Sequence, residues 1–192
     1  MKVQKLAVLS AFLAAPFAIS APAQAAPAVH CASNSLYLVA AVERQDSVGE
    51  RLIVKNNAAG AKAACNAKIG KSDFVIGSKD GEDDDAYYLL RLEGKYLLID
   101  DGTGPDRTLL IYDLSRKARV FTAGYSEEDF DADSKSASFW MSTEQKPTKQ
   151  NCKDLAEIKK NDLTPAIEIR ATFDFTTGTL SKSTQARCVA HQ

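Results

Sequence analysis

The clearest pattern of hydrophobic and polar positions lies near the C-terminus, in AIEIRATFDFT at positions 166–176. Every second position is hydrophobic: Ile167, Ile169, Ala171, Phe173 and Phe175. The positions between them are polar: Glu168, Arg170, Thr172 and Asp174. A period of two predicts a half-buried β-strand. Because a turn sequence follows at 176–179, we expect a C-terminal hairpin with one face in water.

Shorter hydrophobic runs separated by turn residues predict strands along the rest of the chain, at 35–42, 51–55, 73–78, 86–92, 95–100, 108–114, 119–125 and 136–141. Two segments predict short helices, the Ala-rich stretch 56–70 and the amphipathic stretch 152–161. Strands joined by short turns favour a mainly β fold. We expect a single antiparallel β-sandwich or barrel-like domain, made of a meander and the C-terminal hairpin, with two short helices.

The first 25 residues have a different pattern. Lys2 and Lys5 precede an apolar run at 6–19, and the segment ends in Ala23-Gln24-Ala25. This order is typical of a secretory signal peptide, and we predict cleavage after Ala25. The apolar run is shorter than the roughly 20 residues that span a bilayer, although a retained membrane anchor is the alternative. We therefore predict a signal peptide at 1–25, a single mainly β domain at 26–192, and a periplasmic or secreted location without an integral membrane segment after cleavage.

The cysteine count supports this location. The chain has four cysteines, Cys31, Cys65, Cys152 and Cys188, and an even number in an exported protein predicts two disulfides. Three pairings are possible. We favour Cys31–Cys65 with Cys152–Cys188, because each pair closes a local loop of similar size. A zinc site is less favoured, because no two cysteines are close in sequence.

Net charge argues against two classes of partner. The chain has 24 basic and 25 acidic residues, and cleavage after Ala25 would remove two lysines and no acid. The remaining net charge near −3 provides no excess of basic side chains to neutralise phosphates. Nucleic acid and anionic membrane surfaces are therefore not expected partners.

The most distinctive motif is the tip, residues 100–107 (DDGTGPDR), which lies between two apolar runs. Its carboxylates would repel a phosphate, no helix pattern follows, and no Gly-Lys-Ser/Thr ends it. A simple turn accounts for its Asp, Gly and Pro residues. The alternative is a binding loop beside a rigid hairpin. Its candidate residues are Asp100, Asp101, Thr103, Asp106 and Arg107.

Signals for a metal or for catalysis are incomplete. Residues 129–134 (DFDADS) place Asp at alternate positions, as a calcium loop does, but Ser134 and Trp140 stand where Gly and a bidentate Glu are needed. The acidic run 80–85 is a second place where calcium is possible, and we expect no other metal or cofactor. His30 and His191 lie near the termini, and no Gly-x-Ser-x-Gly motif is present. We therefore predict a protein that is not an enzyme.

A resemblance completes the sequence-based picture. The motifs YYLLRLEGKYLLIDDGTGP (87–105) and LLIYDL (109–114), with a closing hairpin that carries a cysteine, resemble small exported proteobacterial proteins of unassigned function. This resemblance supports the fold and implies no activity. We expect a non-catalytic binding or inhibitor-type protein that acts through surface loops on a protein partner in the envelope or host fluid. The alternatives are a calcium- or small-molecule-binding envelope protein and, third, a hydrolase without a recognisable motif.

Overall fold

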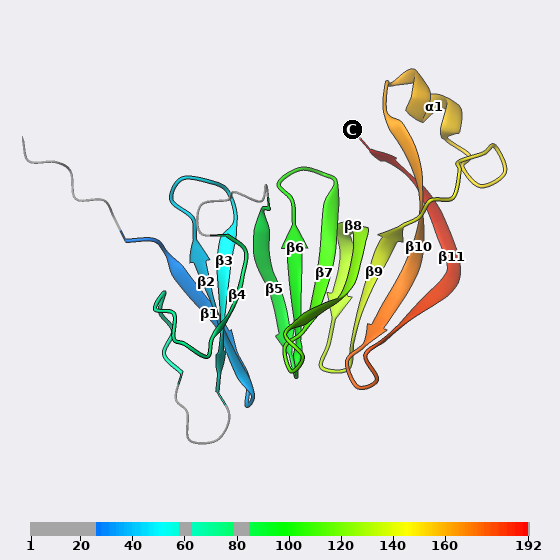
Figure 1. Cartoon of the computed structure of the whole chain (residues 1–192). Coiled ribbons are helices and arrows are strands. Elements are labelled where there is room, and N and C mark those ends of the chain that lie inside the picture. Colours follow the sequence, from blue (N-terminus) through cyan, green and yellow to red (C-terminus); the bar gives the residue numbers. More distant parts are fainter. Residues whose placement is uncertain (1–25, 58–62, 79–84, 192) are drawn as a thin grey trace, which may run out of the picture.

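The computed structural model describes residues 26–57, 63–78 and 85–191. Within these residues the chain forms eleven β-strands and one α-helix, arranged in two antiparallel sheets (Figure 1). The small sheet contains β1 (Val29–Ser33), β2 (Tyr37–Glu43), β3 (Glu50–Asn56) and β4 (Phe74–Ile76). The large sheet is a meander of β5 (Tyr87–Glu93), β6 (Tyr96–Asp101), β7 (Arg107–Asp113), β8 (Ala118–Ala132), β9 (Ser136–Ser142), β10 (Thr164–Asp174) and β11 (Thr179–His191).

The small sheet packs against one end of the large sheet and forms a sandwich there. Val39 and Leu52 of the small sheet form a buried cluster with Leu97, Ile99 and Leu110 of β6 and β7. Side chains alternate along a strand, so Leu97 and Ile99 of β6 face the small sheet. Tyr96 and Leu98 of β6 face the other way. The expected mainly β sandwich is confirmed.

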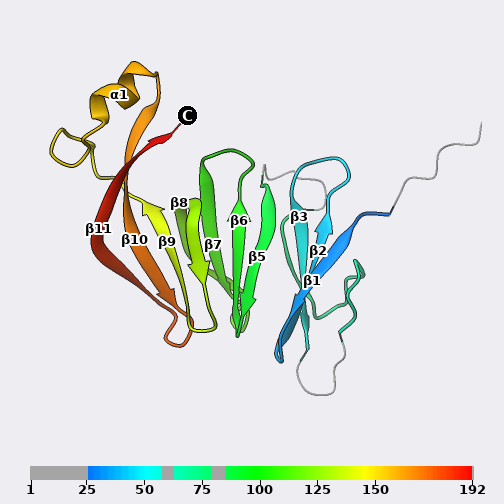
Figure 2. The same ribbon diagram turned by 180° about the vertical axis from the view of Figure 1, so that it is seen from behind.

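The opposite face of the large sheet is rolled around a second core. The ring of Tyr96 on β6 contacts the ring of Phe173 on β10 edge to face, with centroids 5.1 Å apart. Three strands, β7, β8 and β9, separate these two strands in the sheet. The rings can therefore meet only because the sheet curls until its two halves face each other (Figures 1 and 2). The fold thus combines a sandwich with a barrel-like curl.

Gly178, in the β10–β11 turn, lies directly against the Tyr96 side chain, where the two halves of the curled sheet meet. A Cβ atom added at Gly178, whose φ is +69°, would overlap the Tyr96 hydroxyl. We expect Gly178→Ala to lower the free energy of unfolding by about 1–2 kcal/mol for the backbone and by about 1–3 kcal/mol more for the clash. Gly94→Ala is the matched control, because its φ is +54° and nothing lies within 4 Å. Equal losses in urea unfolding would show that the turn does not rest on Tyr96.

The first predicted helix, 56–70, is wrong where the structure describes it. Residues 63–70 are not helical, and 58–62 lie outside the described residues. The Lys55 ammonium donates to the backbone oxygens of Ala64 and Asn66, at 3.3 and 3.1 Å, and to the Asn66 side chain at 2.9 Å. The Cys31–Cys65 disulfide holds the same segment against the small sheet. Tertiary contacts thus override the helix propensity of the alanines.

The second predicted helix is present but shorter than 152–161. Helix α1 (Leu155–Lys160) lies at the end of the large sheet, where Ile158 packs on Ile167 and on the Cys152–Cys188 disulfide. Both disulfides therefore have the favoured pairing. No helix among the described residues is long and apolar enough to cross a membrane.

The predicted strands are all present, with three differences. Strand β1 was not predicted, and β8 extends to Ala132, beyond the predicted end at 125 and through the acidic stretch that follows. The third difference concerns the wet face that was expected for the C-terminal hairpin. Glu168 belongs to that face, yet it is completely buried.

Candidate binding site at the tip of the large sheet

The tip connects β6 to β7, and its two ends are joined by an inward-facing ion pair. Arg107 Nε donates to Asp100 Oδ1 at 3.1 Å, and a second guanidinium nitrogen contacts Asp100 Oδ2. Arg107 also donates to the carbonyl oxygen of Gly102 at 2.7 Å. Asp100 lies two positions after Leu98 on β6, so its side chain is on the face of the sheet that lines the second core. Arg107 lies on the same face of β7. Asp100 and Arg107 thus brace the tip from inside.

A second connection fixes the tip to the start of β5. The Asp101 carboxylate accepts the backbone N–H of Ala86 at 3.0 Å, and the Gly102 N–H donates to the Ala86 carbonyl at 3.2 Å. Thr103 and Asp106 are exposed. Of the five predicted binding residues, three are thus engaged in holding the tip, and two are presented to solvent.

Burial governs the electrostatics beneath the tip. Burial raises the pKa of the Asp100 carboxyl, against the opposing effect of the Arg107 guanidinium. Burial and the nearby Asp100 carboxylate together raise the pKa of the Tyr125 hydroxyl well above its usual value. The side chains of Asp100 and Arg107 are 5 % and 16 % exposed, so most of this ion pair is shielded from water.

Strand β8 contributes an exposed bulge beside the tip. The register with β9 shifts between Ser126 and Asp131, so the β8 bulge (residues 127–130) leaves the ladder. Asp129 has a φ of +61°, and its carbonyl oxygen accepts a hydrogen bond from Arg170 at 2.8 Å. Arg187 reaches the Asp129 carboxylate at 3.3 Å. Two arginines from the C-terminal hairpin thus hold the bulge in place.

Glu168 is the buried anchor of this region. Its carboxylate accepts hydrogen bonds from the Ser126 hydroxyl at 2.6 Å and from Arg187 Nε at 2.7 Å. The Arg187 guanidinium also stacks over Trp140, with its central carbon 4.5 Å from the ring centre. A buried carboxylate is tolerated only when it is paired and hydrogen-bonded, and Glu168 meets both conditions.

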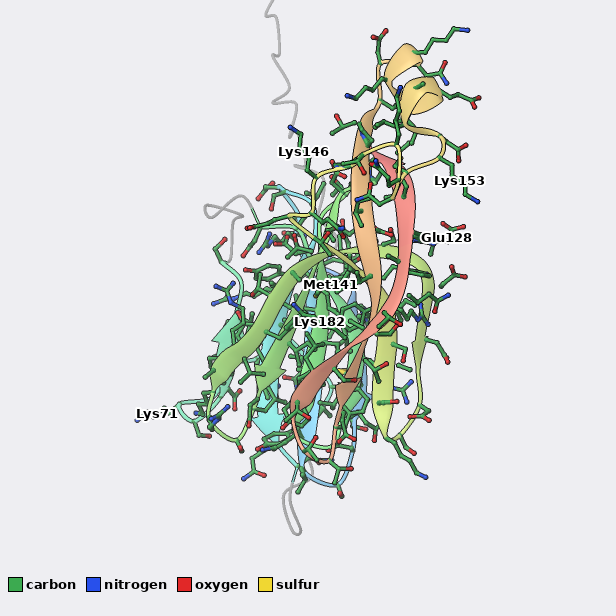
Figure 3. All side chains as sticks on the ribbon, turned by 90° about the vertical axis from the view of Figure 1, so that its right-hand side faces the viewer. Lys71, Glu128, Met141, Lys146, Lys153 and Lys182 are labelled. Carbon is green, nitrogen blue, oxygen red and sulfur yellow. A yellow bond between two sulfur atoms is a disulfide. The ribbon has the colours of Figure 1, made fainter. Side chains whose placement is uncertain are left out.

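The last residues of β11 complete the site. Strand β11 crosses β10 in both views and ends near the tip (Figures 1 and 2), where His191 Nδ1 contacts the Asp106 carboxylate. A groove of about 270 Å³ lies between these elements, and we call it the tip groove. Its lining residues are Gly104, Pro105, Arg107, Ser126, Glu127, Glu128, Arg187, Val189, Ala190 and His191. Glu128 lies at the outer edge of the molecule in Figure 3.

The chemistry of the tip groove is that of ion pairs and hydrogen bonds. The Ser126 hydroxyl donates to a carboxylate, and His191 is held by Asp106, so neither forms a serine–histidine pair in this arrangement. The other histidine, His30, lies on the small sheet, 3.4 Å from Glu50.

The two stretches proposed for calcium have other roles where they are described. Asp129 binds the arginines of the C-terminal hairpin, and Asp133 accepts the backbone N–H groups of Lys135 and Ser136 in a turn. In the acidic run, 79–84 lie outside the described residues, and Asp85 is buried against Arg44. Within the described ranges, no group of three or more His, Cys, Asp or Glu side chains could hold a metal ion.

A larger groove, of about 450 Å³, lies between the two sheets near the β7–β8 turn. Its lining residues include Tyr37, Phe74, Leu114, Lys55 and Lys117. Both ammonium groups are already used, since Lys117 donates to the Ser72 carbonyl at 3.2 Å and Lys55 to the oxygens described above. The tip groove is the better candidate, because segments distant in sequence present exposed charged groups around it.

Sequence reasoning missed most residues of the tip groove. The roles of Ser126, Arg187 and His191, and of Glu168 beneath the groove, depend on contacts between residues 19 to 85 positions apart. One signal was present, because Glu168 stands between two isoleucines in a strand. Comparison of the chain with protein-family models, with curated proteins and with solved structures found no match.

Proposed function

We propose that this is an exported, non-catalytic binding or inhibitor-type protein whose contact surface is the tip groove and its rim. The observation that carries the proposal is the convergence of the tip, the β8 bulge and the end of β11 on one groove. Their exposed groups rest on a braced frame, which includes the Asp100–Arg107 pair, the buried Glu168 and the Cys152–Cys188 disulfide. Preorganised loops on a rigid scaffold lose little entropy on binding.

Two further points support the cellular setting of this proposal. The two disulfides suit an oxidising compartment outside the cytoplasm. The resemblance to small exported proteobacterial proteins fits the same setting and adds no activity. The partner would be a protein of the envelope or of the host fluid.

The test changes the charge of the rim, by which we mean the four exposed acidic side chains around the tip groove. The side chains of Asp106, Glu127, Glu128 and Asp129 are 62–82 % exposed. Immobilised protein is exposed to envelope extract and host-fluid extract, and the retained proteins are identified by mass spectrometry. We expect a stoichiometric partner that is lost with Glu127→Lys/Glu128→Lys at unchanged melting temperature.

Glu43→Lys/Asp46→Lys is the matched control, because it makes the same charge change at exposed positions at the end of β2 and in the β2–β3 connection. A partner that both double variants lose would indicate unspecific charge attraction. A partner that both variants retain would place the contact surface elsewhere on the molecule. The Asp106→Ala/Arg107→Ala pair is unsuitable for this test, because Arg107 braces the tip.

A further inference from the structure

Strand β11 has an unpaired edge that faces the tip groove. It is the outermost strand of the large sheet and pairs with β10 alone. Where β11 crosses β10, its free edge turns toward the tip (Figures 1 and 2), and His191 contacts Asp106 there. An unpaired strand edge presents backbone N–H and C=O groups that can pair with another strand.

An irregularity divides this edge into two parts. Ala186 pairs with Ile169 and Lys182 pairs with Ala171, so Ser183–Gln185 stand opposite Arg170 alone. The Gln185 N–H donates to the Ser183 hydroxyl at 2.8 Å. Such a bulge obstructs continuous pairing with a further strand. The β11 end (residues 186–191) lies beyond it and pairs with β10 in unbroken register.

The tip groove follows the edge of the β11 end. Val189, Ala190 and His191 all line it, although successive side chains of a strand point to opposite faces of the sheet. A hollow that touches consecutive residues therefore runs along the backbone edge. At about 270 Å³ it is slightly smaller than the roughly 300–1,000 Å³ of ordinary small-molecule sites. It is better suited to a protruding segment of another chain than to a whole cofactor.

The rim gives the charge that the incoming segment should carry. Asp106 lies at the tip, and Glu127, Glu128 and Asp129 lie on the β8 bulge. Arg107 and Arg187, the guanidinium groups of the groove, pair with the buried Asp100 and Glu168. The same two arginines lie 3.3–3.9 Å from the carboxylates of Glu127, Glu128 and Asp129, so the acidic groups here outnumber the guanidinium groups. The exposed charge left for a partner is thus mainly negative.

We propose that the β11 end accepts an extended segment with basic side chains from a partner protein, as an additional strand of the large sheet. This inference rests on the proposed function and specifies how the surface would bind. Backbone hydrogen bonds would supply affinity, as in other cases of strand addition. Lysine or arginine side chains at alternate positions would reach the rim carboxylates and fix the register.

The test uses a blocked octapeptide of alternating lysine and threonine with the isotope-labelled, disulfide-bonded protein. Amide exchange is measured by NMR with and without the peptide. We expect slower exchange at residues 186–191 and no change at β1, the edge of the small sheet. The corresponding glutamate–threonine peptide should bind at least about tenfold more weakly, since several weak surface ion pairs are lost.

Two comparisons separate strand addition from simple charge attraction. In the first comparison, two adjacent central residues of the lysine–threonine peptide are N-methylated. Each edge of the peptide then lacks a backbone N–H donor, so the peptide cannot pair as a strand and should lose binding. Strand addition is overturned if the methylated peptide binds as well as the unmodified one. It is also overturned if the unmodified peptide binds without protecting 186–191, or does not bind at millimolar concentration. Protection of 186–191 that grows with protein concentration in the absence of peptide would identify a second copy as the occupant, which also overturns the proposal.

Charge variants connect this test to the capture experiment. Glu127→Gln/Glu128→Gln should weaken the lysine–threonine peptide several-fold, and Glu43→Gln/Asp46→Asn should not. Equal affinities for both variants would contradict the proposed register. Capture of a partner through the rim, combined with failure of strand addition, would retain the proposed function and reject only this mode of binding.

Discussion

Replacement of Arg44 by alanine is expected to lower the free energy of unfolding by about 3–5 kcal/mol, because it leaves a buried charge without its partner. The Arg44 side chain is 1 % exposed, and that of its ion-pair partner Asp85 is 6 % exposed. Arg44 also donates to the carbonyl oxygens of Asp85 and Val48, at 2.6 and 3.2 Å. Arg44 thus links the β2–β3 connection of the small sheet to the residues just before β5, the first strand of the large sheet. Urea unfolding at neutral pH measures the loss.

Two variants give this prediction its controls. Arg116→Ala removes an arginine that is 68 % exposed and 3.3 Å from Asp113, so it should cost less than about 1 kcal/mol. Arg44→Met/Asp85→Leu removes both charges and should recover part of the loss. If Arg44→Ala costs no more than Arg116→Ala, the buried pair does not hold the sheets together.

Removal of the Cys152–Cys188 disulfide is expected to cost about 4 kcal/mol on the chain-entropy model. The two cysteines are 36 residues apart, and Cys188 lies within the β11 end. Cys152→Ser/Cys188→Ser should therefore also speed amide exchange at 186–191, because this segment loses its covalent support. Urea unfolding measures the first effect, and hydrogen exchange by NMR measures the second.

The other disulfide is a matched control for this prediction. Cys31 and Cys65 are 34 residues apart, so the chain-entropy model gives their loss nearly the same effect on stability. Cys31→Ser/Cys65→Ser should leave exchange at 186–191 unchanged relative to global unfolding, because it lies at the small sheet. The same local acceleration in both variants would mean that the Cys152–Cys188 bridge does not stiffen the β11 end.

The fold was largely predictable because its signals are local. Alternation and turn residues located the strands from β2 to β11, and the meander pairs neighbouring strands. The Ala-rich segment was misjudged because two contacts that its own composition does not reveal decide its conformation. One is with Lys55, the residue before the segment, and the other is the disulfide to Cys31, which is 34 residues from Cys65. The extent of β8 was missed because a bulge with exposed acidic side chains has the composition of a loop.

The candidate site was only partly predictable. The tip was located by its Gly, Pro and Asp residues, yet the roles of its side chains were not. Alternation along β6 could have indicated that Asp100 points inward, since it follows Tyr96 and Leu98. The contact between Asp106 and His191 spans 85 residues and requires the crossing of β10 and β11, which no local pattern encodes.

The stacking of Arg187 on Trp140 gives the protein a built-in optical reporter. Trp140 is the only tryptophan of the chain, so all of the indole fluorescence arises from one ring. Trp140 is 8 % exposed, and its ring contacts the guanidinium of Arg187, a residue that also lines the tip groove. Occupancy of the groove that displaces Arg187 would change the emission without any label. Binding at this end of the molecule can thus be followed by the tryptophan fluorescence of the unmodified protein.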